Sequence, residues 1–246
     1  EGKVSFSETV IAKMCSVVTD SKRIVQEKLA EVTPGFSKSF LVEAFDQILI
    51  EEKTPRGFDR GITQFIPKLD LDPFALTKFH GHNAIHYCLG IKAREQGMSF
   101  MHEARQDPAL MDWANEAFVK EAGVGLRYKF TGFPDDLFSE LGFSEYAEDA
   151  LQRMVNPYLR DPIDRVTRDP IRKLGWDDRL IGSIRYAVDA GVHPQKMVEA
   201  ARKGLEEIRE MKNTQNLQSA LDLAWQVEPV VEEMESIRSI ILSALS

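Results

Sequence analysis

The chain has few cysteines and no long apolar segment. Cys15 and Cys88 are its only cysteines, so a disulfide framework is excluded and a reducing compartment is indicated. No apolar run approaches the roughly 20 residues that a membrane-spanning helix requires, and no signal-peptide pattern opens the sequence. These absences predict a soluble, cytoplasmic protein.

An excess of positive charge and a nucleotide-binding loop are also missing. The formal charge of −8 argues against nucleic acid as the main partner, because a phosphate backbone demands a basic surface. No GxxxxGK[ST] loop and no strand–GxGxxG–helix unit occur. The nearest candidate, "GVGLRYKFTG" from Gly123, follows a predicted helix and continues with bulky side chains. We therefore predict that this chain contains no nucleotide-binding fold of its own.

Helix signals dominate what is present. An Asp-Pro pair suits a helix start, because Asp caps the first N–H groups and Pro wastes no donor at the next position. Four such pairs occur, at 72–73, 107–108, 161–162 and 169–170. Apolar periodicity predicts helices over 108 to about 123, about 178–190, 195–211 and from Pro229 to the C-terminus. Strand signals are few, at "KVSFS" (3–7) and "SFLVEAF" (39–45). The prediction is one mostly α-helical domain spanning residues 1–246.

The segment "KFHGHNAIH" (78–86) holds three of the five histidines. If a helix from Asp72 runs through it toward Gly90, Lys78, His82, Asn83 and His86 share an arc of about 140° at about 100° per residue. The remaining positions are largely apolar. This pattern predicts a helix with one buried face and one chemically active face.

Three interpretations of that face compete. In the first interpretation, the residues are polar groups that are solvated at the surface or hydrogen-bonded in the core. In the second, His82 and His86 at i,i+4 share a metal ion, although no carboxylate on the face supplies a third ligand. In the third, the face transfers a proton, which needs a lysine base with a pKa lowered by burial and an amide donor for an oxyanion. Lys78 and Asn83 fit those roles, and His86 would orient the substrate.

Two motifs carry a resemblance to a known family. The spacing Lys-x4-Asn-x2-His, met by Lys78, Asn83 and His86, resembles the polyol-specific long-chain dehydrogenases, the mannitol dehydrogenase family. The longer stretch "NPYLRDPIDRVTRDPIRKLGWDDRLIG" (156–182) resembles the mannitol-1-phosphate 5-dehydrogenases of that family. An alternative register aligns Leu89-Gly90 and places Ala75 at the lysine position.

The resemblance implies a fold and a reaction. The chain would be the helical C-terminal substrate domain, and a Rossmann domain that binds NAD would lie N-terminal to it, outside this sequence. The start without an initiator Met fits that expectation. The implied reaction interconverts D-mannitol 1-phosphate and D-fructose 6-phosphate by hydride transfer. Lys78 would be the base, Asn83 would stabilise the oxyanion, and His86 would hold substrate hydroxyls. No metal is expected, and no membrane or nucleic-acid partner.

Substrate-binding residues are expected in two groups. His80 and His82 would add contacts beside the catalytic residues. A basic group in the second motif would clamp the phosphate, because arginine binds phosphate bidentately; its members are Arg160, Arg165, Arg168, Arg172, Lys173 and Arg179. The competing interpretation pairs these cations with neighbouring aspartates at the surface. Two other functions stay open: a hexuronate or free-polyol dehydrogenase of the same family, and a helical binding domain without catalysis.

Overall fold

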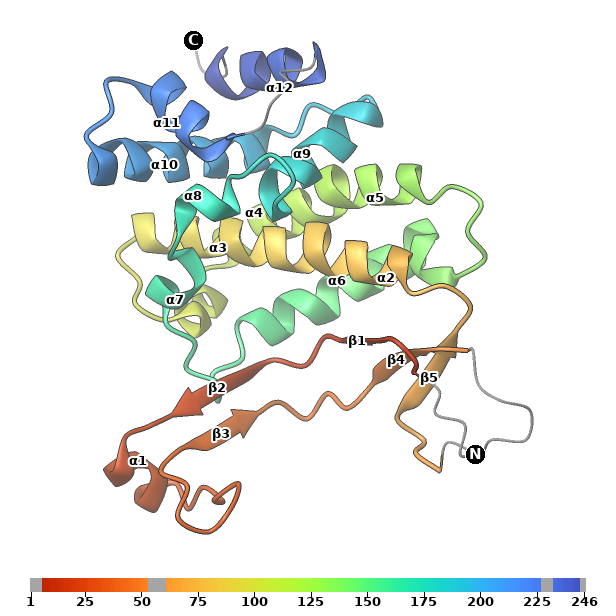
Figure 1. The fold of residues 1–246 in the computed structure, drawn as a ribbon, viewed down its shortest axis with the longest axis vertical. Coiled ribbons are helices and arrows are strands. Elements are labelled where there is room, and N and C mark those ends of the chain that lie inside the picture. Colours follow the sequence, from red (N-terminus) through yellow and green to blue (C-terminus); the bar gives the residue numbers. More distant parts are fainter. Residues whose placement is uncertain (1–5, 53–60, 227–231, 244–246) are drawn as a thin grey trace. The chain divides into compact units, whose positions relative to one another are not determined.

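The structure is a computed structural model that describes residues 6–52, 61–226 and 232–243. The chain divides into two compact units, each described here by itself. The first comprises residues 1–76 together with 157–160, and the second comprises residues 77–156 and 161–246. Figure 1 shows strands in the first unit and helices throughout the second.

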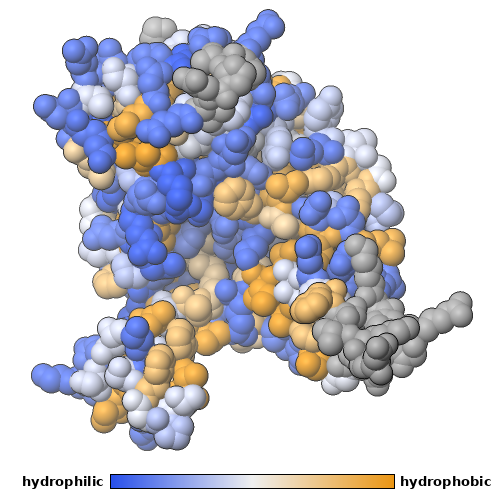
Figure 2. Space-filling view, viewed as in Figure 1, coloured by the Kyte–Doolittle hydropathy of each residue, from blue (hydrophilic) through white to orange (hydrophobic). Residues whose placement is uncertain are grey.

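The first unit contains two small sheets. Its elements are β1 (Thr9–Ile11), β2 (Cys15–Val18), α1 (Ser21–Gln26), β3 (Ser39–Val42), β4 (Ile48–Glu51), β5 (Phe65–Lys68) and α2 (Asp72–Leu76). Strand β4 pairs antiparallel with β1 and parallel with β5, whereas β2 pairs antiparallel with β3. Val17, Phe40 and Val42 stay exposed on the β2–β3 ladder, which belongs to a hydrophobic patch in Figure 2. The strand expected over 39–45 is confirmed for residues 39–42, which form β3, while most of the segment 3–7 lies outside the described residues.

The second unit is helical. Its elements are η1 (Thr77–His82), α3 (Asn83–Glu95), η2 (Met101–Gln106), α4 (Pro108–Glu116), η3 (Ala117–Ala122), α5 (Gly123–Lys129), η4 (Asp136–Phe138), α6 (Glu140–Met154), α7 (Ile163–Thr167), α8 (Pro170–Lys173), α9 (Arg179–Asp189), α10 (Gln195–Lys212), α11 (Leu217–Ala224) and α12 (Glu232–Ser243). The segments η1 and η3 are π-helical and η2 and η4 are 3₁₀ helices. The mostly α-helical class is confirmed.

The core of this unit surrounds α3. Ile85 and Leu89 of α3, Phe118 of η3, Leu126 of α5 and Leu205 of α10 are all fully buried. Helix α3 contacts α7, α9 and α10, and Figure 1 shows α3 running across the middle of the helices. Burial of apolar side chains from so many elements fixes the position of α3, and with it the histidine-rich segment.

The Asp-Pro pairs start helices by different means. Asp107 caps α4 as predicted, because its carboxylate accepts from the N–H of Leu110 at 3.1 Å. Asp161 is not a cap: α7 begins at Ile163 behind Pro162, and the carboxylate of Asp161 is held by an arginine instead. Asp169 precedes α8 in the left-handed conformation without a side-chain capping bond. Helix α9 has Asp178 as its cap, close to the predicted start.

The predicted stop of a helix at Gly123 is wrong. The helical path continues through η3 into α5 as far as Lys129. A Cβ at Gly123 would lie 2.5 Å from the ring of Phe143, so this glycine permits close packing and does not end the helix. The candidate loop "GVGLRYKFTG" is therefore largely helical, and it does not form the glycine-rich turn that binds a phosphate.

The surface of the helical unit is mixed. Figure 2 shows hydrophilic side chains spread over the visible face, with hydrophobic patches between them. Within the described residues, no helix combines the length and apolar composition needed to cross a membrane. The two cysteines are free thiols, Cys15 exposed and Cys88 buried.

Candidate active site

The histidine-rich segment is only partly an α-helix. Residues 77–82 form the π-helical segment η1, and α3 begins at Asn83. A π-helix closes its hydrogen bonds one residue further along than an α-helix and is frequent at functional sites. Its wider turn alters the rotation per residue, so the arc predicted for a regular α-helix does not apply across Lys78 and His82.

His80 is a packed, buried side chain. Its Nδ1 lies 3.2 Å from the carbonyl oxygen of Arg179 at the start of α9, and its ring meets Tyr186 edge-on at 4.9 Å. A Cβ at Gly182 would lie 2.3 Å from Cε1 of His80. Burial lowers the pKa of His80, so the neutral ring is favoured. These contacts fix η1 against α9.

His86 lies at the centre of a charged group. Its Nε2 is 3.4 Å from Oδ2 of Asp161, and its ring centroid is 6.1 Å from that of His82. Burial, followed by the positive charges of Arg165, Lys173 and Arg179, lowers the pKa of His86 to about 3. The ring is therefore neutral at physiological pH and can exchange hydrogen bonds with a ligand.

Lys173 is a buried cation beside this histidine. Only 4% of the residue is exposed. Its Nζ donates to the carbonyl oxygen of Val166 at 2.5 Å and lies 5.4 Å from the ring centroid of Tyr87. Burial lowers its pKa to about 8, with further contributions from Arg179, Arg172 and Arg168. A lysine in this state is available for proton transfer near neutral pH.

Lys78 has a different charged neighbour. It is half-buried, and burial lowers its pKa, followed by the charge of Arg153 on α6. The charges that act on His86 come instead from the segment that contains α7, α8 and the start of α9. Asn83 is half-buried at the first position of α3. Lys78 and His86 thus respond to separate sets of charges.

The basic group of the second motif divides into paired and unpaired side chains. Arg165 binds Asp161, and Arg172 binds Asp169 at 2.8 Å and Asp178 at 3.3 Å. Arg168 is exposed at the end of α7 and forms no ion pair with a described residue. The surface-pairing interpretation therefore holds for Arg172, whereas Arg168 remains available to an anion.

Arg160 belongs to the first unit and is considered apart from this group. It is exposed, has a positive φ of 47° and lies 3.9 Å from Glu27. Any role of Arg160 toward a phosphate remains a prediction.

Asp161 was not among the predicted site residues. Asp161 is 2% exposed, and its i,i+4 spacing to Arg165 was a usable sequence signal. Arg179, a member of the basic group, stacks over the ring of Phe79 at 5.3 Å. Glycine permits the close approach of α7 to α3, because a Cβ at Gly90 would lie 2.9 Å from Val166.

Within the described ranges, no three His, Cys, Asp or Glu residues lie close enough together to bind one metal ion.

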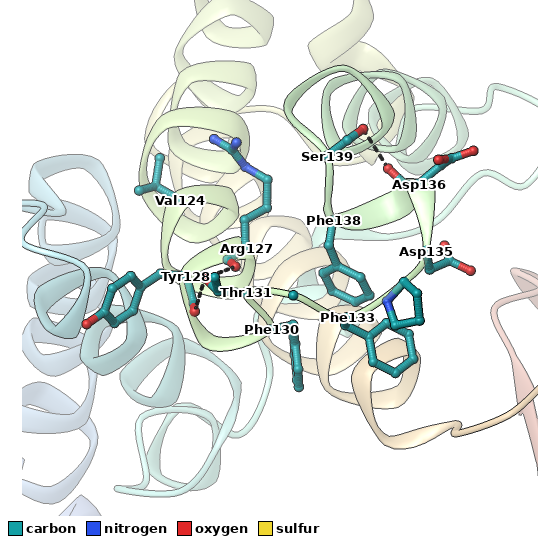
Figure 3. Close-up of a pocket in the computed structure, with 12 residues that line it drawn as sticks. Val124, Arg127, Tyr128, Phe130, Thr131, Phe133, Asp135, Asp136, Phe138 and Ser139 are labelled. Atoms are coloured by element: carbon teal, nitrogen blue, oxygen red, sulfur yellow. Dashed lines mark hydrogen bonds between the residues drawn. The ribbon is translucent and has the colours of Figure 1, made fainter.

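A cavity lies apart from the histidine group. Its volume is about 630 Å³, and it is lined by the end of α5 and the segment 131–139, with Arg127 and Phe138 among its residues. Figure 3 shows the rings of Phe130, Phe133 and Phe138 gathered there. None of the predicted site residues lines this cavity.

The fold and this histidine group together define a helical domain with a buried site among cationic side chains. The sequence model of the mannitol dehydrogenase C-terminal domain matches residues 70–221. The chain belongs to that family.

Relatives with known names share part of this chain. It is 31% identical over 157 residues to the mannitol-1-phosphate 5-dehydrogenase of Halalkalibacterium halodurans, covering 64% of this chain and 40% of that protein. It is 30% identical over 154 residues to the enzyme of the same name from Lacticaseibacillus casei, covering 62% and 38%. The chain thus matches less than half the length of these relatives.

Solved structures share the fold. Mannitol 2-dehydrogenase of Pseudomonas fluorescens, in a ternary complex with NAD and D-mannitol, superposes with a TM-score of 0.64 at 16% identity and covers 83% of this chain and 39% of that one. A substrate-free D-sorbitol dehydrogenase superposes with a TM-score of 0.71 at 14% identity, covering 97% and 51%. At these identities the likeness concerns the fold alone.

Proposed function

We propose that this chain supplies the substrate site of an NAD-dependent polyol-phosphate dehydrogenase. The reaction would interconvert D-mannitol 1-phosphate and D-fructose 6-phosphate. The observation that carries the proposal is the position of His86, which is 13% exposed and lies 3.4 Å from Asp161 among cationic side chains in an otherwise acidic chain. A ligand with hydroxyls and a phosphate matches both features, and the related mannitol-1-phosphate 5-dehydrogenases bear such a substrate in their name.

The phosphate would bind at the end of α7. Arg168 is exposed, its charge acts on Lys173, and no carboxylate of the described residues pairs with it. Guanidinium groups bind phosphate by paired, charge-assisted hydrogen bonds. Arg165 and Arg172 would contribute positive potential while they remain bound to aspartates. This favours an anionic substrate over a free polyol, and the names of the related mannitol-1-phosphate 5-dehydrogenases favour a phosphate over the carboxylate of a hexuronate.

The proton would be taken by a lysine. Oxidation of a secondary alcohol requires removal of the hydroxyl proton as hydride leaves the carbon. Lys78 is the base that the sequence motif proposes, and its burial favours the neutral amine. Lys173 is the alternative, because its charge acts on His86 and both groups experience the charge of Arg179. Asn83 would donate to the developing oxyanion, and His82 and His86 would hold substrate hydroxyls.

NAD would accept the hydride when bound. The described residues do not form a strand–glycine turn–helix unit that could hold its pyrophosphate, since Gly123 and Gly125 lie in α5. We therefore place the cofactor mainly on an N-terminal Rossmann domain outside this chain, in keeping with the share of the relatives that the chain matches. The steps assigned to this chain concern substrate binding and the proton.

The test is an assay of the full-length protein with NAD and D-mannitol 1-phosphate. We expect NADH to form at a rate that saturates with substrate. If NADH forms with a hexuronate or free D-mannitol and not with the phosphate, the enzyme class stands and the substrate is wrong. If no member of the panel is oxidised, a non-catalytic binding domain becomes the better account.

A further inference from the structure

Asp161 is a buried carboxylate that contacts two elements of the helical unit. It is 2% exposed. The Nε and Nη2 atoms of Arg165 donate to its two oxygens at 2.6 Å and 2.5 Å, and Nε2 of His86 lies 3.4 Å from Oδ2. A buried carboxylate is costly unless it is paired and hydrogen-bonded. Arg165 meets that requirement and fixes the direction of both oxygens.

The neutral ring of His86 can exist as either of two tautomers. The ring is neutral, for the reasons of burial and surrounding positive charge given above. Its Nε2 is buried without a hydrogen bond, and 13% of the side chain is exposed. A neutral imidazole carries its proton on either Nδ1 or Nε2, and the other nitrogen is an acceptor.

The neighbouring carboxylate distinguishes the two tautomers. With the proton on Nδ1, two acceptors, Nε2 and Oδ2, would lie 3.4 Å apart with no proton between them. With the proton on Nε2, the N–H lies beside that oxygen but off the direction of a hydrogen bond, and a rotation of the ring would align the pair. Carboxylates commonly fix a histidine tautomer in this manner.

We infer that Asp161 is a positioning residue that holds His86 in the Nε2–H tautomer and leaves Nδ1 as a hydrogen-bond acceptor. A ligand that binds there must offer a donor, as a hydroxyl does. The inference deepens the proposed function and rests on it for the identity of that ligand. The tautomer itself follows from Asp161, Arg165 and His86 and can be tested without any activity.

Nitrogen-15 NMR of the 246-residue chain, with labelled histidine, tests the tautomer directly. The His86 signals, assigned by their loss in His86→Gln, should show a protonated Nε2 and an unprotonated Nδ1 between pH 6 and pH 8. In Asp161→Asn the side chain can donate as well as accept, so the pattern should move toward the other tautomer. A protonated Nδ1 in the wild type overturns the inference, and this outcome does not depend on whether the variant folds. An unchanged pattern in a folded Asp161→Asn protein also overturns it.

Kinetics of the full-length protein separate positioning from general stability. Losing one oriented hydrogen bond to the substrate should raise KM for the polyol about 10-fold in Asp161→Asn, with kcat much less affected. If the wild-type spectrum shows the Nε2–H tautomer but no polyol is oxidised, the positioning role stands and the proposed function fails. A fall in kcat with unchanged KM and unchanged tautomer would mean that Asp161 has only a structural role.

Discussion

The carboxylate of Glu121 accepts a hydrogen bond of 2.9 Å from the backbone N–H of Met197. Its other oxygen accepts from the N–H of Lys196 at 2.8 Å. Both N–H groups belong to the first turn of α10, which begins after Pro194, a residue with no side-chain acceptor. A glutamate from η3 therefore caps a helix that lies far from it in the sequence, because its two oxygens accept from N–H groups of the first turn.

Replacement of Glu121 should destabilise the helical unit. In Glu121→Ala, two buried N–H groups lose their acceptor, so the free energy of unfolding should fall by about 1–3 kcal/mol. Glu121→Gln keeps one acceptor and should lose less. Urea titration followed by circular dichroism measures both values, and equal stability of all three proteins would contradict the capping role.

The same residue predicts a pH dependence. Burial raises the pKa of Glu121 above its ordinary value, so the folded protein binds this proton more tightly than the unfolded chain. The contribution of the group to stability is greatest below the unfolded pKa of about 4.3 and is lost as the pH rises through the folded pKa. Wild type should therefore gain stability relative to Glu121→Gln as the pH falls from neutrality toward that value. If the stability difference between wild type and Glu121→Gln stays constant over this pH range, the raised pKa of Glu121 is contradicted.

Gly182 should tolerate no side chain while His80 is present. A Cβ there would lie 2.3 Å from the His80 ring, so Gly182→Ala should cost about 1–3 kcal/mol of stability by overpacking. In a His80→Ala background the same change should cost much less. Urea unfolding of the wild type, the two single variants and the double variant gives the interaction energy between the two sites. This energy should differ from zero. Additive costs would show that the ring and the glycine are not in contact.

Local chemistry explains which elements could be predicted from the sequence. Asp107 with Pro108, and Asp178 before α9, provide caps that act within a few residues, and the helices begin there. The prediction that the helix ends at Gly123 was wrong, because a glycine can either end a helix or allow close packing within one. Only the position of Phe143 distinguishes the two cases.

The candidate site shows the same limit. Two separate motifs predicted that His86 and Lys173 lie near the substrate. In the structure both lie among charged side chains, with Lys173 buried and His86 13% exposed. The π-helical turns of η1 carry no recognisable signal in "TKFHGH", so the direction of Lys78 could not be derived. The contact of His86 with Asp161 depends on packing between α3 and the start of α7, which no local pattern specifies.

The identity of the base can be settled by two lysine variants. A lysine base must be neutral to accept the hydroxyl proton, so polyol oxidation by the full-length protein should rise with pH to a plateau. Lys78→Ala should lower the rate by roughly 10²–10⁴-fold and remove this rise. Lys173→Ala should weaken binding of the substrate and retain the pH profile.

The control is Lys92→Ala. Lys92 is paired with Glu95 and Glu199, and its removal should leave both the rate and the profile nearly unchanged. If Lys78→Ala keeps normal turnover while Lys173→Ala loses the rise, the base is Lys173, whose pKa of about 8 would then set the midpoint.

The substrate preference of Arg168→Gln tests the central claim most directly. The measurement is the ratio of kcat/KM for D-mannitol 1-phosphate to that for D-mannitol, in the full-length protein with NAD. Wild type should prefer the phosphate. Arg168→Gln should lower the ratio about 10-fold or more, because a charge-assisted hydrogen bond contributes roughly 1.5–3 kcal/mol, while activity on D-mannitol changes little. Arg105→Gln, an exposed arginine on η2, is the matched control and should leave the ratio unchanged. A wild-type enzyme without preference for the phosphate, or equal ratios in wild type and Arg168→Gln, would contradict the account.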